Sequence, residues 1–188
     1  NYYYFYYIYL LIMCGITAII GEFNINIIID CLLKLQNRGY DSAGISIIDN
    51  TNVISTYKEL NQESIINLKK KIQHLDNNYF KNIISHTRWA THGGITINNC
   101  HPHLSYNKKI NLVHNGIIEN YNELKIFLLS QNYIFNSETD SEVISNLIDY
   151  YLKNNSINNA IIIALSKCIG TWGLVIQYID TPEYLYCI

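Results

Sequence analysis

The sequence predicts a single α+β domain in which very apolar strands lie between layers of helices. The chain has 188 residues, of which 49% are hydrophobic and 15% are charged, which suits one sizeable core. Helical and strand patterns are mixed along the chain without strict alternation. The strand-like runs are so apolar that we expect helices to cover them.

The first part of the chain is expected to form a strand, a helix and a second strand. Residues 14–20 (CGITAII) and 43–49 (AGISIID) are β-rich runs. Between them, residues 24–36 carry apolar side chains at helical spacing, and a glycine follows at position 39.

The rest of the chain is expected to contain four helices and three strands. The helices are predicted at 64–75, 121–131, 141–153 and 157–169, and the strands at 82–87, 110–115 and 172–179. The longest segment outside these elements is 98–109, and a loop of that length in a compact domain is either functional or mobile.

Composition excludes several classes of protein. A formal net charge of −2 leaves no basic face for nucleic acid or for an anionic membrane surface. The five cysteines are odd in number and form no CxxC pair, so we expect neither a disulfide framework nor a zinc site, and we expect a cytoplasmic protein. The apolar segment 1–12 is shorter than the roughly 20 residues that span a bilayer and lacks the features of a signal peptide.

The chain contains only two arginines, and both lie in short polar motifs. Arg38 belongs to NRGYDSAG (37–44), and Arg88 belongs to SHTRWATHGG (85–94). A guanidinium binds a carboxylate through two parallel hydrogen bonds, which a lysine cannot do. We therefore expect both arginines to have a functional role. The alternative is that they are surface residues without one.

Three further turns carry candidate chemistry, each with an ordinary structural alternative. Cys14 at the head of a strand is either a nucleophile or a small core residue. The Asn115 amide and the Gly116 N–H could hold an oxyanion, or form an Asn-Gly hairpin turn. Asp140 could bind a substrate ammonium, or, with Thr139, begin a helix.

The histidines do not suggest a metal site. None of the six falls in HExxH or a similar spacing, so His101 and His103, on either side of Pro102, are interpreted as loop residues rather than ligands. No glycine-rich phosphate loop has the required spacing. We therefore expect no metal and no organic cofactor.

Five motifs occur in a family-specific order: MCGI, RGYDSAG, HTRWATHG, HNGIIENY and SETDSE. Together they resemble the glutaminase domain of glutamine:fructose-6-phosphate aminotransferase, a class II glutamine amidotransferase of the N-terminal-nucleophile hydrolase superfamily. The resemblance runs from Cys14 to about Ile188. It implies a four-layer α/β/β/α sandwich of two mainly antiparallel sheets.

The resemblance also implies residue roles. Cys14 corresponds to the nucleophile that attacks the glutamine side-chain amide, with its own α-amino group as the base. Arg88 corresponds to the residue that binds the α-carboxylate, Asp140 to the one that binds the α-ammonium, and Asn115 with Gly116 to the oxyanion hole. The remaining assignments are Trp89, Thr91 and His92 as pocket walls and Arg38 as a support for the loops over the nucleophile.

The resemblance finally implies a domain plan. Residues 14–188 form the glutaminase domain, truncated at its C-terminal end, and residues 1–13 are an upstream segment that is untranslated or removed. The ammonia would serve the conversion of fructose-6-phosphate to glucosamine-6-phosphate by a sugar-isomerising half outside this chain, in a homo-oligomeric full-length protein. The alternatives are the glutaminase domain of another class II amidotransferase, a non-catalytic glutamine-binding module, or an inert fragment in which Cys14 stays inside a longer chain.

Overall fold

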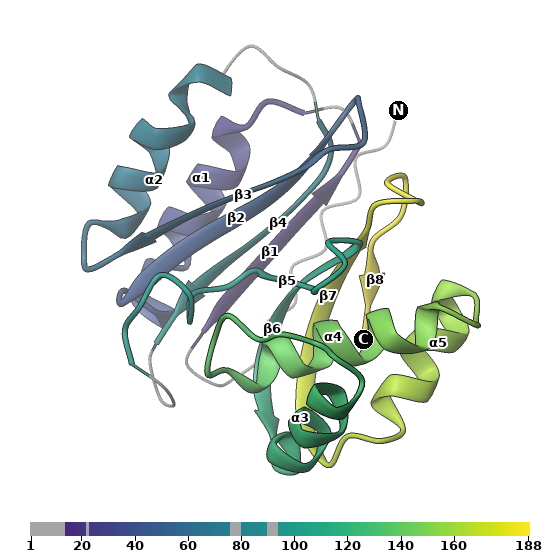
Figure 1. The fold of residues 1–188 in the computed structure, drawn as a ribbon. Helices are drawn as coiled ribbons and strands as arrows, with labels where there is room; N and C mark the ends of the chain where they lie inside the picture. Colours follow the sequence, from purple (N-terminus) through teal and green to yellow (C-terminus); the bar gives the residue numbers. More distant parts are fainter. Residues whose placement is uncertain (1–13, 22, 76–79, 90–93) are drawn as a thin grey trace.

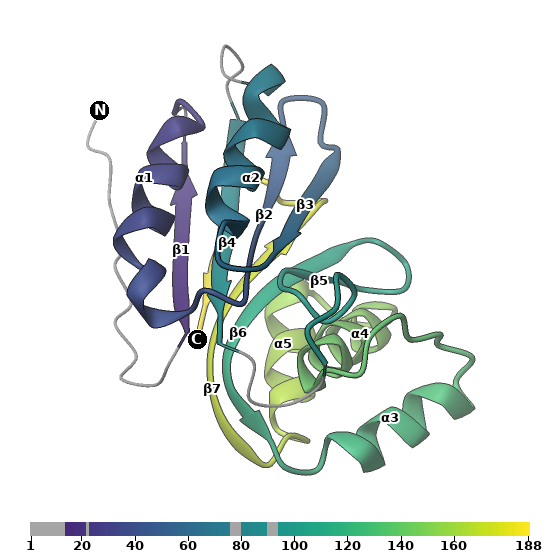
Figure 2. The ribbon, with the colours of Figure 1, turned by 90° about the vertical axis from the view of Figure 1, so that its left-hand side faces the viewer.

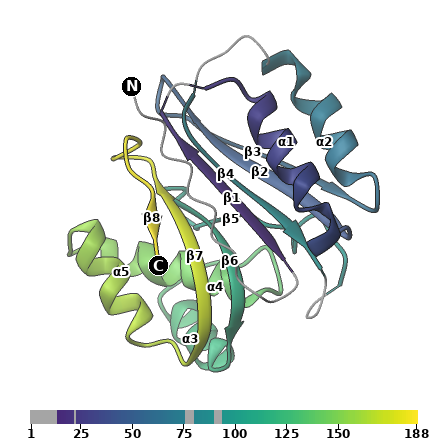
Figure 3. The same ribbon diagram turned by 180° about the vertical axis from the view of Figure 1, so that it is seen from behind.

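The computed structural model describes residues 14–21, 23–75, 80–89 and 94–188. These residues form four layers, in which two antiparallel sheets face each other and helices cover both outer faces (Figure 1). Figure 2 looks onto α1 and α2, which lie in front of the first sheet, and Figure 3 shows the same layers from behind. The expected α/β/β/α sandwich is therefore confirmed.

The first sheet has four strands in the order β1-β4-β2-β3. Their bounds are β1 Gly15–Ile20, β2 Ser42–Asp49, β3 Ile54–Leu60 and β4 Phe80–Arg88. Helices α1 (Asn26–Lys34) and α2 (Ser64–Ile72) lie on its outer face, each followed by a 3₁₀ turn, at Gln36–Arg38 and Gln73–Leu75.

The second sheet has the order β5-β6-β7-β8. Its strands are β5 His103–Leu104, β6 Ile110–Ile118, β7 Gly170–Tyr178 and β8 Tyr186–Cys187. The covering helices are α3 Tyr121–Ser130, α4 Asp140–Leu152 and α5 Ile157–Leu165. Helix α4 packs on β6, and α3 and α5 pack against α4.

The core is divided among the layers. One apolar cluster lies between α1, α2 and the first sheet and includes Ile28, Leu32, Ile45, Leu68 and Ile83. A second lies between the other sheet and its helices and includes Leu112, Ile144, Leu147, Ile161 and Leu174. The apolar cluster between the two sheets is small, with Ile16, Ile84, Val113 and Val175 as its buried members.

A row of amides and hydroxyls completes the contact between the sheets, and we call it the polar seam (Ser46, Thr56, Asn82, Asn111 and Gln177). All of these residues are buried except Thr56, which is exposed at the edge strand. The Asn111 amide donates to Ser46 Oγ at 2.8 Å and to Thr56 Oγ1 at 3.0 Å. The Gln177 amide donates to the Ser46 carbonyl at 3.1 Å and to Asn82 Oδ1 at 2.5 Å. Because these bonds have defined geometry, the seam fixes how one sheet lies on the other.

Most predicted elements are present, with differences at short or edge elements. Strand β3 was not predicted, and the predicted loop 98–109 contains the two-residue strand β5. Helix α5 ends at Leu165 rather than at residue 169, and β6 continues past residue 115 to Ile118. All five cysteines are free, and no helix in the described part of the chain is long and apolar enough to cross a bilayer.

Candidate active site

A cavity of about 360 Å³ opens where the end of β4, the C-terminal part of β6 and the start of α4 meet. Six of the predicted site residues line it: Cys14, Arg88, Trp89, Asn115, Gly116 and Asp140. The sequence assigned no site role to its other lining residues, which are His86, His101, His114, Ile117, Ile118, Tyr121, Glu138, Thr139, Ser141 and Thr171. Thr91 and His92 lie outside the described residues.

Cys14 lies against the end of β4. The pairing of Gly15 with Thr87 places it beside Arg88 and Trp89, and its Sγ accepts a hydrogen bond from the Trp89 N–H at 3.3 Å. Burial raises the pKa of the Cys14 thiol, although this hydrogen bond and the charges of Arg88 and Arg38 act in the opposite direction. The thiol is therefore protonated at neutral pH, so nucleophilic attack requires a base.

The RGYDSAG motif lies under the Arg88–Trp89 backbone. A Cβ on Gly39 would be only 2.6 Å from the Arg88 carbonyl carbon, so this close approach requires glycine. The Asp41 N–H donates to the Arg88 carbonyl at 3.1 Å, and the Tyr40 ring meets the Trp89 ring edge-on at 4.9 Å. Arg38 is half-buried and does not line the cavity, but its charge reaches the Cys14 thiol.

Arg88 and Asp140 give the cavity opposite charges. Arg88 ends β4, is almost fully buried, and donates through Nη1 to the Gly94 carbonyl at 3.4 Å. Asp140 is the first residue of α4, whose N-cap is Thr139, as one alternative from the sequence had it. One Asp140 oxygen, Oδ2, accepts the Ile118 N–H at 2.8 Å. A zwitterionic ligand would find a cationic and an anionic group in this cavity.

Asn115 and Gly116 lie inside strand β6, paired with Gly173 and Trp172 of β7. The hairpin-turn interpretation of this dipeptide is therefore wrong. The Asn115 amide donates through Nδ2 to the Cys14 carbonyl at 3.0 Å, so the amide is adjacent to the candidate nucleophile. Gly116 has φ +143°, and a Cβ there would be 2.0 Å from the Thr171 carbonyl oxygen, so only glycine fits at this position.

Four histidines form a buried cluster beside the cavity: His86, His101, His103 and His114. Burial lowers the pKa of each, in the case of His86 to about 3. The loop interpretation is right for His101, which lies in a bend before β5 although its side chain is buried and bonds Ser141 Oγ at 2.8 Å, and wrong for His103, which begins β5. The described residues contain no group of three or more histidine, cysteine or acidic side chains placed to hold a metal ion.

The sequence did contain a signal for one of these histidines. His86 lies two residues before Arg88 on the same strand, and alternate residues of a strand face the same side. His114 directly precedes Asn115, but neighbouring residues of a strand face opposite sides, so the alternation does not indicate its place. No local pattern indicates the contacts of His101, which depend on packing against α4.

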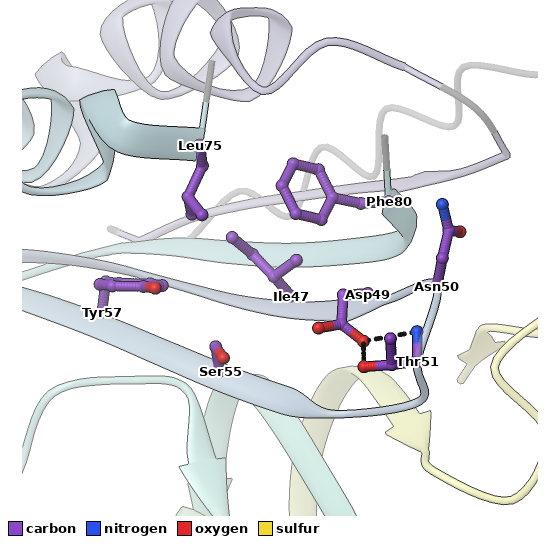
Figure 4. A pocket seen from close by; sticks show the side chains of 8 residues that line it. All are labelled: Ile47, Asp49, Asn50, Thr51, Ser55, Tyr57, Leu75 and Phe80. Carbon is purple, nitrogen blue, oxygen red and sulfur yellow. Dashed lines mark hydrogen bonds between the residues drawn. The ribbon is translucent and has the colours of Figure 1, made fainter. Parts of the chain in front are cut away.

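A second cavity, of about 280 Å³, lies near the β2–β3 turn (Figure 4). Among the described lining residues the carboxylate belongs to Asp49, whose Oδ1 accepts hydrogen bonds from the Thr51 N–H, the Thr51 hydroxyl and the Val53 N–H at 2.6–3.0 Å. Because hydrogen bonds within the turn already occupy the Asp49 carboxylate, this cavity is a weaker candidate for a functional site than the first.

Comparisons with known proteins identify the relatives of this chain. A glutamine–fructose-6-phosphate aminotransferase (isomerizing) from Methanococcus maripaludis is 45% identical over 180 residues, which is 92% of this chain and 29% of the relative. The enzyme of the same name from Clostridium acetobutylicum is 41% identical over 179 residues, 94% of this chain and 28% of the relative. The chain therefore spans less than a third of the length of these relatives.

Solved structures agree as well. A glutamine phosphoribosylpyrophosphate (PRPP) amidotransferase from B. subtilis, complexed with ADP and GMP, superposes with a TM-score of 0.65 at 28% identity, covering 79% of this chain and 31% of that one. The family model described as a glutamine amidotransferase domain matches residues 86–186, which is more than half of the sequence and includes every lining residue of the cavity except Cys14. The chain belongs to the glutamine amidotransferase domain family.

Proposed function

We propose that the protein hydrolyses the side-chain amide of glutamine to glutamate and ammonia, with Cys14 as the nucleophile. The observation that carries this proposal is the convergence of the Cys14 thiol, the Asn115 amide, Arg88 and Asp140 on one cavity. A thiol, an oxyanion donor and two opposite charges match the groups of an amino acid whose side chain is an amide.

Substrate binding uses the two charges. The Arg88 guanidinium binds the glutamine α-carboxylate through two parallel hydrogen bonds. Asp140 binds the α-ammonium through the oxygen capacity that Ile118 and Ser141 leave free. Trp89, which lines the cavity, forms a wall of the site. Thr91 and His92 complete that wall in this proposal.

The reaction proceeds through a thioester. Cys14 Sγ attacks the amide carbon, and the developing oxyanion accepts hydrogen bonds from Gly116 and from the Asn115 amide hydrogen that the Cys14 carbonyl does not use. The C–N bond breaks, and ammonia leaves with the proton that the base took from the thiol. Water then hydrolyses the thioester and releases glutamate.

The base in this proposal is the α-amino group of Cys14. A free α-amine has a pKa of about 7.7 to 8.0, whereas a peptide nitrogen has no useful basicity. The raised pKa of the buried thiol supports the need for such a base. The proposal therefore requires that residues 1–13 are untranslated or removed, so that the active domain begins at Cys14.

The ammonia is proposed to convert fructose-6-phosphate to glucosamine-6-phosphate in a sugar-isomerising part outside these 188 residues. The two relatives described above support this acceptor by their names and by identities of 45% and 41%. A homo-oligomeric full-length protein and a cytoplasmic location complete the proposal, and the five free cysteines support a reducing compartment.

A direct assay tests the proposal. The chain beginning at Cys14 is incubated with L-glutamine, and glutamate and ammonia are measured. Cys14→Ala should abolish release, whereas Cys187→Ser, which changes an exposed cysteine of β8, should retain it. Release that survives Cys14→Ala would refute the nucleophile. For the acceptor, the full-length protein should form glucosamine-6-phosphate from fructose-6-phosphate, and failure to do so would refute that part.

A further inference from the structure

The Asn115 side-chain amide has its orientation set at both ends. Its nitrogen lies 3.0 Å from the Cys14 carbonyl oxygen, and a carbonyl oxygen only accepts hydrogen bonds. The amide must therefore direct its NH₂ group toward Cys14. Its oxygen, Oδ1, then faces His86 Nε2 at 2.9 Å.

This orientation determines the tautomer of His86. Because Asn115 Oδ1 accepts, His86 Nε2 must carry a hydrogen. The His114 backbone also acts on this ring, but Nδ1 is buried and makes no contact with hydrogen-bond geometry among the described residues, so an N–H there would be a costly, poorly paired donor. Burial keeps the imidazole neutral, since it lowers the pKa of His86 to about 3. The ring thus presents one N–H, and it presents it to Asn115.

We propose that His86 is a positioning residue whose Nε2–H holds the Asn115 amide with its NH₂ group directed at Cys14 and the substrate. The inference rests on the proposed function, which makes Asn115 an oxyanion donor. The Cys14 carbonyl selects which end of the amide faces it, while the bond from His86 fixes the opposite end. With both ends held, the unused amide hydrogen has one direction, into the cavity.

The His86 ring is itself held in place. It packs on the His101 ring at a centroid distance of 4.1 Å and an interplanar angle of 30°, and His101 is tied to α4 through Ser141 Oγ at 2.8 Å. The His101 backbone in turn lies against Gly44 of β2, where a Cβ would be 2.1 Å from its carbonyl oxygen. Packing thus orients His86, and His86 orients the Asn115 amide. Such support by surrounding residues is needed to hold a functional group in a precise position.

Loss of the His86 donor should affect turnover more than binding. Without it, Asn115 Oδ1 becomes a buried unpaired acceptor, and the amide gains by rotating toward water. Misdirecting the oxyanion donor should cost at most as much as deleting it, roughly a hundred- to a thousandfold in kcat. We expect His86→Leu to lower kcat about tenfold to a hundredfold with little change in the glutamine KM.

A double-mutant cycle in the chain beginning at Cys14 tests the connection. His86→Leu should lower kcat in the wild type but have almost no further effect in Asn115→Ala, because the group it positions is gone. His86→Gln places an amide N–H at the same number of bonds from Cβ and should restore much of kcat. His103→Gln, at an equally buried histidine that contacts Thr139 instead, should keep kcat close to the wild type.

Two outcomes of the cycle would overturn the proposal. One is an effect of His86→Leu that is the same with and without Asn115, which would mean a general structural role. The other is a kcat of His86→Leu equal to that of the wild type. Either result leaves the proposed function intact if wild-type release of glutamate still depends on Cys14.

Nitrogen-15 NMR of the histidine side chains provides a readout that does not depend on activity. We expect His86 to show a neutral ring protonated at Nε2 throughout pH 5 to 9. A ring protonated at Nδ1, or an imidazolium, would refute the positioning role even in a chain that releases no glutamate. Absence of turnover in the wild type would, by contrast, refute the proposed function alone.

Discussion

The substitution Gly116→Ala tests whether the close approach of β6 and β7 at this residue is needed for stability and for the candidate active site. Gly116→Ala adds one methyl group at φ +143°, 2.0 Å from the Thr171 carbonyl oxygen and 2.9 Å from His114 Nε2. The backbone conformation alone costs about 2 kcal/mol for a residue with a Cβ, and overpacking adds about another 2 kcal/mol. The expected loss of about 4 kcal/mol corresponds to a decrease in Tm of about 8 to 16 °C for a chain of this size.

Substitutions at two other glycines separate the cost of the backbone conformation from the cost of overpacking. Gly21 has φ +107°, and no atom of the described residues lies within 4 Å of a Cβ there, so Gly21→Ala should cost only the conformational part, about 2 kcal/mol. Gly170 has φ +139° and a Cβ position 2.0 Å from the Ile117 carbonyl oxygen, so Gly170→Ala should destabilise as much as Gly116→Ala. Gly116→Ala should in addition lower kcat, measured below both transitions.

Thermal unfolding followed by circular dichroism gives the Tm of each glycine variant, and the glutamate assay gives its kcat. Equal Tm decreases for Gly116→Ala and Gly21→Ala would refute the argument from close approach. A Gly116→Ala variant that is destabilised yet turns over as fast as Gly170→Ala would remove the Gly116 N–H from the oxyanion hole.

Three further predictions concern the proposed residue roles. Arg88→Lys should raise the glutamine KM roughly tenfold to a hundredfold, because a single point charge replaces two aligned bonds; an unchanged KM would exclude Arg88 from carboxylate binding. Asn115→Ala should lower kcat roughly a hundred- to a thousandfold with KM largely kept, and wild-type turnover would contradict its role. Because burial raises the pKa of Cys14, its alkylation by iodoacetamide in the chain that retains residues 1–13 should be slower at pH 7 than that of free cysteine and should accelerate as pH rises. Mass spectrometry of the peptide that contains Cys14 measures this rate, and fast labelling at pH 7 would contradict the raised pKa.

The parts of the site that the sequence predicted are those encoded in short segments at strand ends. Arg88 closes β4, and Thr139 with Asp140 begins α4. The rarity of arginine in the chain singled out Arg88, and helix-capping chemistry indicated the start of α4. The fold class followed from apolar strands that needed cover on both sides. Cys14 could be placed at the head of β1, but its contact with Trp89 depends on the pairing of β1 with β4.

The parts that the sequence did not predict depend on long-range packing. The Asn115-Gly116 dipeptide has the composition of a turn, yet nine-residue pairing with β7 keeps it in a strand. The charged and polar residues of β3 weaken its strand pattern, and it forms because it pairs along β2 at the sheet edge. His101 becomes buried only because α4 and β2 enclose it, and no local pattern encodes that enclosure.

The polar seam has a consequence for how accurately the site can be assembled. Cys14 adjoins one sheet and Asn115 belongs to the other, so the distance between nucleophile and amide depends on the lateral alignment of two separate layers. Purely apolar faces tolerate small sliding movements, because dispersion and burial have no preferred direction. The bonds from Asn111 and Gln177 to Ser46 and Asn82 oppose such sliding. Because Asn111 lies on the same strand as Asn115, a seam variant that stays folded could still shift the Asn115 amide relative to Cys14 and so lower kcat.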